Sequence, residues 1–213
     1  MTLSEIANYR LANHQLTGTK FTTPGELVSY MGAIQAQDYA MAKWAIGIRI
    51  STTENKIEEA LNNGDILRTH VLRPTWHFVA ANDIHWMLKL TGPHIKAQSA
   101  SMCRKLELDN KLLNRCNSII EKALTGNKYL TREEIIFELN KKGIATNELR
   151  SVLIMMNAEL DGIVCNGYRR DKQFTYALLD KKRAKSYTKE EALVALAKRY
   201  FISHGPAILQ DFA

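Results

Sequence analysis

Two glutamines separated by one small residue are the first candidates for chemistry. Gln35 and Gln37 flank Ala36 in the segment GAIQAQDY, where a helical pattern runs out near Gly32. On a helix the two side chains would point to nearly opposite sides, whereas in an extended segment they share one face. Two adjacent amides could then hold a water molecule through donor and acceptor bonds. A solvated polar patch at a helix end accounts for the same residues, and from these residues alone we favour it.

The histidines do not suggest a metal site. His70 and His77 fall on a predicted hairpin, and His85 and His94 follow it, at spacings that match no known pair of metal ligands. We therefore predict no metal and no cofactor. We expect these histidines to be structural or to contact phosphate.

The composition argues against a disordered, membrane-spanning or secreted protein. Of the 213 residues, 46% are apolar and 24% are charged, which suits one or two domains with their own cores and argues against disorder. No apolar run reaches the roughly 18 residues that span a bilayer, and the N-terminus shows no secretory signal. Three cysteines without a CxxC pair indicate free thiols in a reducing compartment. We expect an intracellular, cytoplasmic protein without a membrane partner.

Positive charge is concentrated in the second half of the chain. The net charge is +7, and residues 1–100 contribute only one unit of it. Much of the rest lies in residues 169–189, which carry eight Lys and Arg residues against two Asp. A polyanion is the natural partner of such a cluster, and nucleic acid is the commonest one. A solvated linker without a partner remains the alternative.

The elements that must position these residues begin at a recurring motif. A Thr followed three residues later by a Glu, a capping box, occurs at Thr2, Thr23, Thr131 and Thr188. In the first hundred residues we predict helices near 3–16, 24–34 and 55–63. A hairpin should follow, over 66–72 and 75–79. Its turn is predicted at Arg73-Pro74, because proline fits poorly inside a central strand.

The second half repeats this order. A helix should begin at Thr131 and stop at Gly143, and another should run from near Thr146 to Leu160. Short strands are predicted at 163–165 and 174–178, joined by the basic turn NGYRRDK. The order is typical of a winged helix. We therefore predict an α+β, mainly helical fold of tandem winged helix-turn-helix modules with short β-hairpin wings.

Winged helices commonly bind duplex DNA. The second helix enters the groove while the wing contacts phosphate. Arg169, Arg170 and Lys172 suit a wing contact, and Arg150 lies on the polar face of the second helix. Use of the modules for protein contact stays open, because a fold does not fix a function.

The modules have predicted boundaries. We place the first, which carries the two glutamines, at residues 1–100 and the second, with the basic wing, at 101–187. Helices near 82–90 and 108–124 should join them. Residues 188–213 are expected to be the start of a third, truncated module, with a helix that ends near Ser203 and another that Pro206 opens.

Three segments, taken in order, resemble one protein family. GAIQAQDYAMAKWAIGIR, ILRTHVLRPTWHFVAANDIHWML and YFISHGPAILQDFA are similar to the AlkZ-like winged-helix DNA glycosylases. This family includes enzymes that unhook azinomycin-type interstrand crosslinks and excise N7-alkylated purines. The resemblance runs from about Ala7 to the last residue. Its most specific elements are the Gln-x-Gln-Asp block and the hairpin pattern Arg-Thr-x-x-x-Arg-x-Thr-x-His.

The resemblance implies a function and a set of site residues. The catalytic Gln-x-Gln motif of the family maps onto Gln35, Ala36 and Gln37, whereas a sister branch carries Asp at the third position. The expected protein is a monomeric, monofunctional DNA glycosylase acting on double-stranded DNA that contains an alkylated purine. The hairpin residues Arg68, Arg73 and His77 match the family pattern and are expected to contact DNA.

The resemblance also implies parts that this sequence does not contain. The family has three tandem winged helices around a concave basic surface and a C-terminal β-rich part. We therefore expect the chain alone to bind or cleave DNA poorly. A DNA-binding regulator without enzymatic activity and a protein-interaction module remain alternatives. The regulator is the less favoured, because operator binding usually requires a two-fold dimer and no dimerisation helix is evident.

Overall fold

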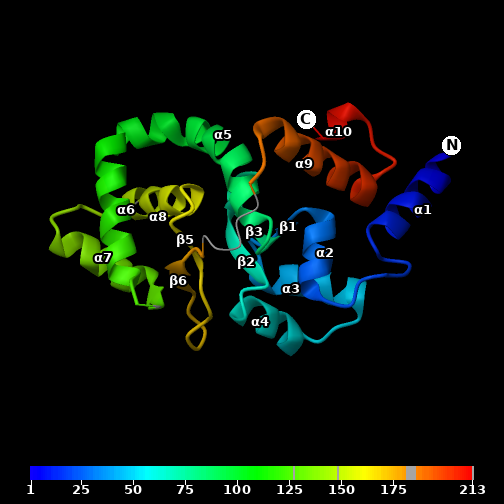
Figure 1. Ribbon diagram of the computed structural model, residues 1–213, viewed down its shortest axis with the longest axis horizontal. Helices are drawn as coiled ribbons and strands as arrows, with labels where there is room; N and C mark the ends of the chain where they lie inside the picture. The colour runs from blue at the N-terminus through cyan, green and yellow to red at the C-terminus, as the bar shows by residue number, and fades with distance from the viewer. Residues whose placement is uncertain (127, 148, 181–185, 213) are drawn as a thin grey trace.

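Two winged-helix modules lie side by side in the computed structural model and are joined by the long helix α5, Ile84–Lys105 (Figure 1). The structure describes residues 1–126, 128–147, 149–180 and 186–212. It confirms the predicted fold class, with helices around two small antiparallel sheets. In the described part of the chain, no helix is long and apolar enough to cross a membrane.

The first module has the element order of a winged helix. Its three strands pair antiparallel in the order β1-β3-β2, with helices between the first and second strands. Its core contains fully buried side chains from α2, α4 and β3, namely Leu27, Ile57 and Phe78. The elements are α2 Pro24–Met31, β1 Ile34–Gln35, α3 Tyr39–Ile50, α4 Glu54–Asn62, β2 Ile66–Val71 and β3 Arg73–Ala80.

Helix α3 was not predicted from the sequence. Its start is fixed by Asp38, whose side-chain oxygen accepts a bond from the Met41 N–H at 3.1 Å. Ala42 and Ile46 are buried, but Met41, Trp44 and Ile48 are exposed on the other side of the helix. Apolar residues on both faces conceal the helical period that a one-sided helix would show.

The hairpin turn differs from its predicted position. It lies at Leu72, with φ 65°, and Arg73 and Pro74 already belong to β3. β3 is the central strand, so the expectation that Pro74 would form the turn was wrong. Proline is tolerated there because β1 pairs with β3 only from Trp76 onward, beyond the residue that lacks an N–H.

The second module repeats the topology of the first. Its sheet has the order β4-β6-β5, and Ile120, Ile135, Ile154 and Val164 pack in its core. The predicted strands and the helix stop at Gly143, with φ 74°, are confirmed to within one or two residues. The elements are α6 Asn110–Leu124, β4 Leu130–Thr131, α7 Arg132–Lys141, α8 Leu149–Leu160, β5 Val164–Asn166 and β6 Thr175–Leu178.

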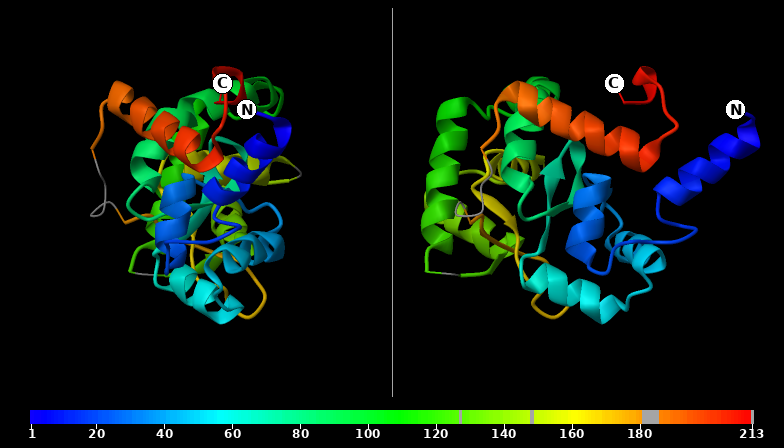
Figure 2. Two further views of the ribbon diagram at one scale, coloured as in Figure 1. Left: turned by 90° about the vertical axis from the view of Figure 1, so that its right-hand side faces the viewer. Right: turned by 45° about the vertical axis from the view of Figure 1, so that its right-hand side comes forward.

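The remaining helices lie at the end of the molecule that carries both termini (Figures 1 and 2). Helix α1, Leu3–Asn13, packs against α9, Lys189–His204, and the short α10 covers Leu209–Phe212. All four predicted capping boxes are present, with the Thr and Glu bonds formed in both directions. The predicted helix at 82–90 continues through Pro93 to Lys105 as α5, and α9 ends at His204 as expected.

Candidate functional site

The Gln35-Ala36-Gln37 segment is extended and continues β1 past its last paired residue. Gln35 is opposite His77 in the antiparallel register, and the Ala36 N–H donates to the Trp76 carbonyl at 2.7 Å. Ala36 is fully buried, whereas Gln35 and Gln37 are both exposed. Because successive side chains of a strand alternate between faces, this alternation of exposed and buried residues is the pattern expected if the two glutamines lie on the same side of the segment.

The neighbouring sequence holds this segment at both ends. Gly32, with φ 82°, lets the chain turn out of α2 into β1, a conformation that favours glycine. Asp38 then caps α3, so its carboxylate is engaged with the helix backbone. The Gln37 side-chain oxygen accepts from the Trp76 N–H at 3.5 Å, and the Gln37 amide nitrogen can still donate a hydrogen bond.

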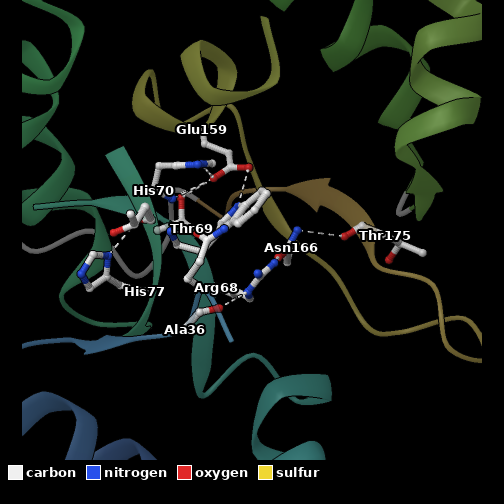
Figure 3. Close-up of polar contacts among 11 residues, drawn as sticks. Ala36, Arg68, Thr69, His70, His77, Glu159, Asn166 and Thr175 are labelled. Carbon is white, nitrogen blue, oxygen red and sulfur yellow. Dashed lines mark hydrogen bonds and ion pairs between the residues drawn. The ribbon is translucent and has the colours of Figure 1, made fainter. Parts of the chain in front are cut away.

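Behind the segment lies the buried guanidinium of Arg68, which is 5% exposed. Its Nε donates to the Ala36 carbonyl at 3.0 Å, and its Nη1 donates to Asn166 Oδ1 at 2.9 Å (Figure 3). The guanidinium also stacks over the rings of Trp76 and Phe174, at 4.3 and 4.6 Å from their centroids. Arg68 therefore contacts the first sheet and the wing of the second module at once.

A second buried group, Glu159 of α8, also connects the two modules through hydrogen bonds. Its side chain has no exposed surface, and it accepts bonds from the His70 N–H at 2.8 Å and from His70 Nδ1 at 2.7 Å (Figure 3). The Thr69 hydroxyl and the Trp76 indole N–H lie at 3.4 Å from the carboxylate. Four donors on β2 and β3 thus meet one acceptor from α8.

Glu159 and Asn166 were missed as site residues by the sequence analysis. Asn166 opens the turn NGYRRDK and was assigned only to that turn. Glu159 lies among the apolar residues of α8, between Ala158 and Leu160. An acidic residue inside an apolar helix face was the available signal, because a buried carboxylate requires donors nearby.

His77 is buried and neutral. Its Nδ1 lies 2.9 Å from the Thr75 carbonyl, which can only accept, so Nδ1 carries the proton. Burial lowers the pKa of His77 to about 4, and the positive charge of Arg73 acts in the same direction. At 3% exposure, His77 cannot reach a DNA phosphate in this conformation.

We expect this buried imidazole to make stability depend on pH. The folded protein binds its proton near pH 4 and the unfolded chain near 6.5, so the stabilisation is complete above pH 6.5 and is lost as the pH falls toward 4. The loss between pH 7 and 4 should be about 3 kcal/mol. His77→Asn, which keeps a donor for Thr75, should show a correspondingly smaller loss in urea unfolding. An equal loss in both proteins would contradict this assignment.

The other predicted DNA contacts differ in accessibility. Arg73 and Lys172 are exposed, and Arg170 forms a half-exposed ion pair with Glu134 at 2.7 Å. Arg169 donates to the Lys172 carbonyl at 2.8 Å and stacks on Tyr39 and Phe174.

The remaining basic residues are engaged or fall outside the structure. Arg150 donates to the carbonyls of Ala145 and Leu106. Arg68, like His77, is too buried to reach phosphate in this conformation. Four further basic residues of the predicted cluster lie outside the described residues, namely Lys181, Lys182, Arg183 and Lys185.

The C-terminal half of helix α8, the counterpart of a DNA-reading helix, is enclosed by the protein, whereas Leu149 and Val152 near its start are exposed. Residues 154–160 are all buried, which means that the helix is covered on every side there. It packs against α5, α6, β2 and β5. The polar face expected for this helix is therefore not free. Asn157, for example, donates to the Asp161 carboxylate at 2.8 Å.

The corresponding helix of the first module, α4, is acidic. Glu54 and Glu58 pair with the buried Lys43 of α3, and Glu59 is exposed. Acidic side chains repel a phosphate backbone. Neither module therefore presents a basic second helix to a DNA groove.

Comparisons with known proteins agree on one family. The family model described as DNA glycosylase AlkZ-like matches residues 28–213, which include both glutamines and both modules. The structure of Streptomyces sahachiroi DNA glycosylase AlkZ is similar over 100% of this chain and 60% of that chain, with a TM-score of 0.81 and 18% sequence identity. That likeness shows the fold. Among curated proteins, no sequence matches the chain significantly.

The chain spans about 60% of the length of the AlkZ chain that it matches. With a family match over most of its residues, the chain belongs to the AlkZ-like family of DNA glycosylases.

Proposed function

We propose that the protein is a monofunctional DNA glycosylase that hydrolyses the N-glycosidic bond of N7-alkylated purines in double-stranded DNA, interstrand crosslinks included. Gln35 and Gln37 position the attacking water. The observation that carries this proposal is that Gln35 and Gln37 are both exposed on either side of the buried Ala36, at the end of the edge strand β1. An enzyme must hold such groups close to their working geometry before substrate arrives.

The chemistry suits neutral amides. A purine alkylated at N7 carries a positive charge, and it leaves as a neutral base when the electron pair of the C1′–N9 bond moves onto it. The sugar passes through an oxocarbenium-like state, water adds to C1′, and the water proton goes to solvent. No general acid is needed for the leaving group. Orienting the water and stabilising the developing sugar charge are the remaining tasks, and amide dipoles can perform both.

DNA binding is assigned to the exposed basic residues of the two wings. Arg73 lies on the first hairpin, and Arg170 and Lys172 lie on the second. Arg169 and Arg150 bond to backbone carbonyls, so we place them at the edge of this surface. Phosphate contacts of this kind position a protein on DNA without reading its sequence.

A sequence-specific regulator is the weaker alternative. Such a protein reads base edges in the major groove, usually with the second helix of the helix-turn-helix. The enclosure of α8 and the acidic surface of α4 oppose that use.

Removing one wing charge should change the salt dependence of DNA binding. Lys172→Ala should reduce the slope of log affinity against log salt by about 1, equally for damaged and undamaged duplexes. Lys89→Ala, which removes the same charge from an exposed position on α5, should leave the slope unchanged. Fluorescence anisotropy over a salt series measures both. Identical slopes for the two variants would contradict a phosphate contact at Lys172.

The proposed activity is tested by base release. The purified full-length protein is incubated with a duplex containing one N7-methylguanine and with the same duplex undamaged, and free base and abasic sites are quantified. We expect release from the damaged duplex only, and no strand cleavage before alkali treatment. Salt-sensitive binding without release would favour the regulator. Absence of both binding and release would favour a protein-interaction module.

A further inference from the structure

We propose that Arg68 is the positioning residue of the Gln-x-Gln segment and that Asn166 is its anchor in the second module. This inference rests on the proposed function. It gives the second module a part in catalysis that does not involve touching DNA.

The contact point of Arg68 determines what it can control. Its Nε bonds to the carbonyl of Ala36, the residue between the two glutamines, at 3.0 Å. That carbonyl belongs to the peptide group that leads into Gln37. Since a peptide group is planar, fixing its oxygen fixes the direction in which the next residue leaves the strand. The Ala36 N–H is held from the other side by the Trp76 carbonyl at 2.7 Å.

The arrangement requires the shape of an arginine. Two donors of one planar group point to two different elements, the Ala36 carbonyl and Asn166 Oδ1. The flat face lies against Trp76 and Phe174, which come from different modules. A lysine carries the same charge but has no planar fork, so it cannot satisfy both acceptors and both rings.

The anchor is itself oriented by the wing. Asn166 is buried at the end of β5, and its Nδ2 lies 3.4 Å from the Thr175 carbonyl of β6. This contact presents Oδ1 toward Arg68. The buried carboxylate of Glu159 supplies negative charge near the guanidinium. A chain of contacts thus runs from the second sheet through Asn166 and Arg68 to the peptide before Gln37.

Arg68 and Arg73 lie on the same hairpin but are suited to different roles, positioning for Arg68 and phosphate contact for Arg73. Both belong to the same sequence pattern, but Arg68 is 5% exposed and Arg73 is exposed to solvent. Only the second can meet a phosphate. A positioning residue should therefore affect the rate of the chemical step, whereas a phosphate contact should affect affinity.

The test compares three variants in single-turnover base release from N7-methylguanine DNA at saturating protein, together with DNA affinity and thermal stability. Arg68→Lys and the milder Asn166→Ala remove the contacts. Ile135→Ala, in the core of the second module, is the control for lost stability.

We expect Arg68→Lys to lower the rate constant by about 10- to 100-fold and Asn166→Ala to lower it less. The dissociation constant of both variants for DNA should stay within about twofold of wild type. Ile135→Ala should lower the melting temperature without lowering the rate constant.

Hydrogen exchange of the Ala36 amide gives a readout that does not depend on activity. It should be faster in Arg68→Lys than in Ile135→Ala, because only the first variant releases the segment. A rate constant in Arg68→Lys equal to that of Ile135→Ala would overturn the inference. If the wild-type protein releases no base, the proposed function fails, and the exchange comparison alone decides. Equal exchange in the two variants would then overturn the positioning role.

Discussion

Replacing Gln37 with alanine is expected to lower the single-turnover rate constant for N7-methylguanine release by about 100-fold or more, the usual cost of removing one positioned polar group at a reacting centre. The Gln37 amide is exposed, and only its oxygen has a bond, at 3.5 Å from the Trp76 N–H. Its removal should therefore alter the chemistry more than the fold. Gln35→Ala should have an effect of the same order, because the proposed mechanism has both amides hold the same water.

Two further variants make this result specific. Gln37→Asn keeps the amide but withdraws it by one methylene, and it should lose most of the rate, since the position of the group matters as much as its type. Gln98→Ala removes an exposed glutamine from α5 and should retain the wild-type rate constant. Equal release by wild type and Gln37→Ala would remove Gln37 from the mechanism.

The largest effect on stability is expected at Glu159. Glu159→Leu keeps a similar volume but leaves the N–H groups of His70 and Trp76 and the Thr69 hydroxyl without their acceptor. Leaving these buried polar groups without a hydrogen-bond partner should lower the free energy of unfolding by about 3 to 5 kcal/mol. Urea denaturation followed by circular dichroism measures the change.

Paired substitutions separate this effect from a general loss of charge. Glu159→Gln retains one carbonyl acceptor and should cost clearly less than Glu159→Leu. Glu121→Leu, at an exposed position on α6, should change stability by no more than about 0.5 kcal/mol. If Glu159→Leu unfolds at the same urea concentration as wild type, the buried network does not stabilise the junction of the modules.

The helix starts were predictable because their causes are local. A Thr and a Glu three residues apart determine a capping box, and all four of these motifs mark a helix start. Helix α3 escaped prediction because Trp44 and Ile48 are apolar but exposed. The turn at Leu72 was misplaced because the length of β1, which decides where proline is tolerated in β3, depends on a pairing distant in sequence.

The site was predictable only in part, for the same reason. The spacing of Gln35 and Gln37 is a local property, and their shared face follows once the segment is extended. The burial of Arg68 is not local, because it arises where the two modules meet. An arginine on a hairpin is read as a DNA contact unless its partner, here Asn166, is known to lie 98 positions later in the chain.

The enclosure of α8 has a consequence for how a protein of this kind would search a chromosome. Alkylation damage arises at purines in any sequence context. A repair enzyme that bound preferentially to particular sequences would therefore miss lesions elsewhere. The buried half of α8, residues 154–160, cannot form hydrogen bonds with base edges. Contacts to phosphate alone permit sliding along undamaged duplex. The same packing that joins the two modules would therefore make the movement of the protein along DNA independent of the base sequence.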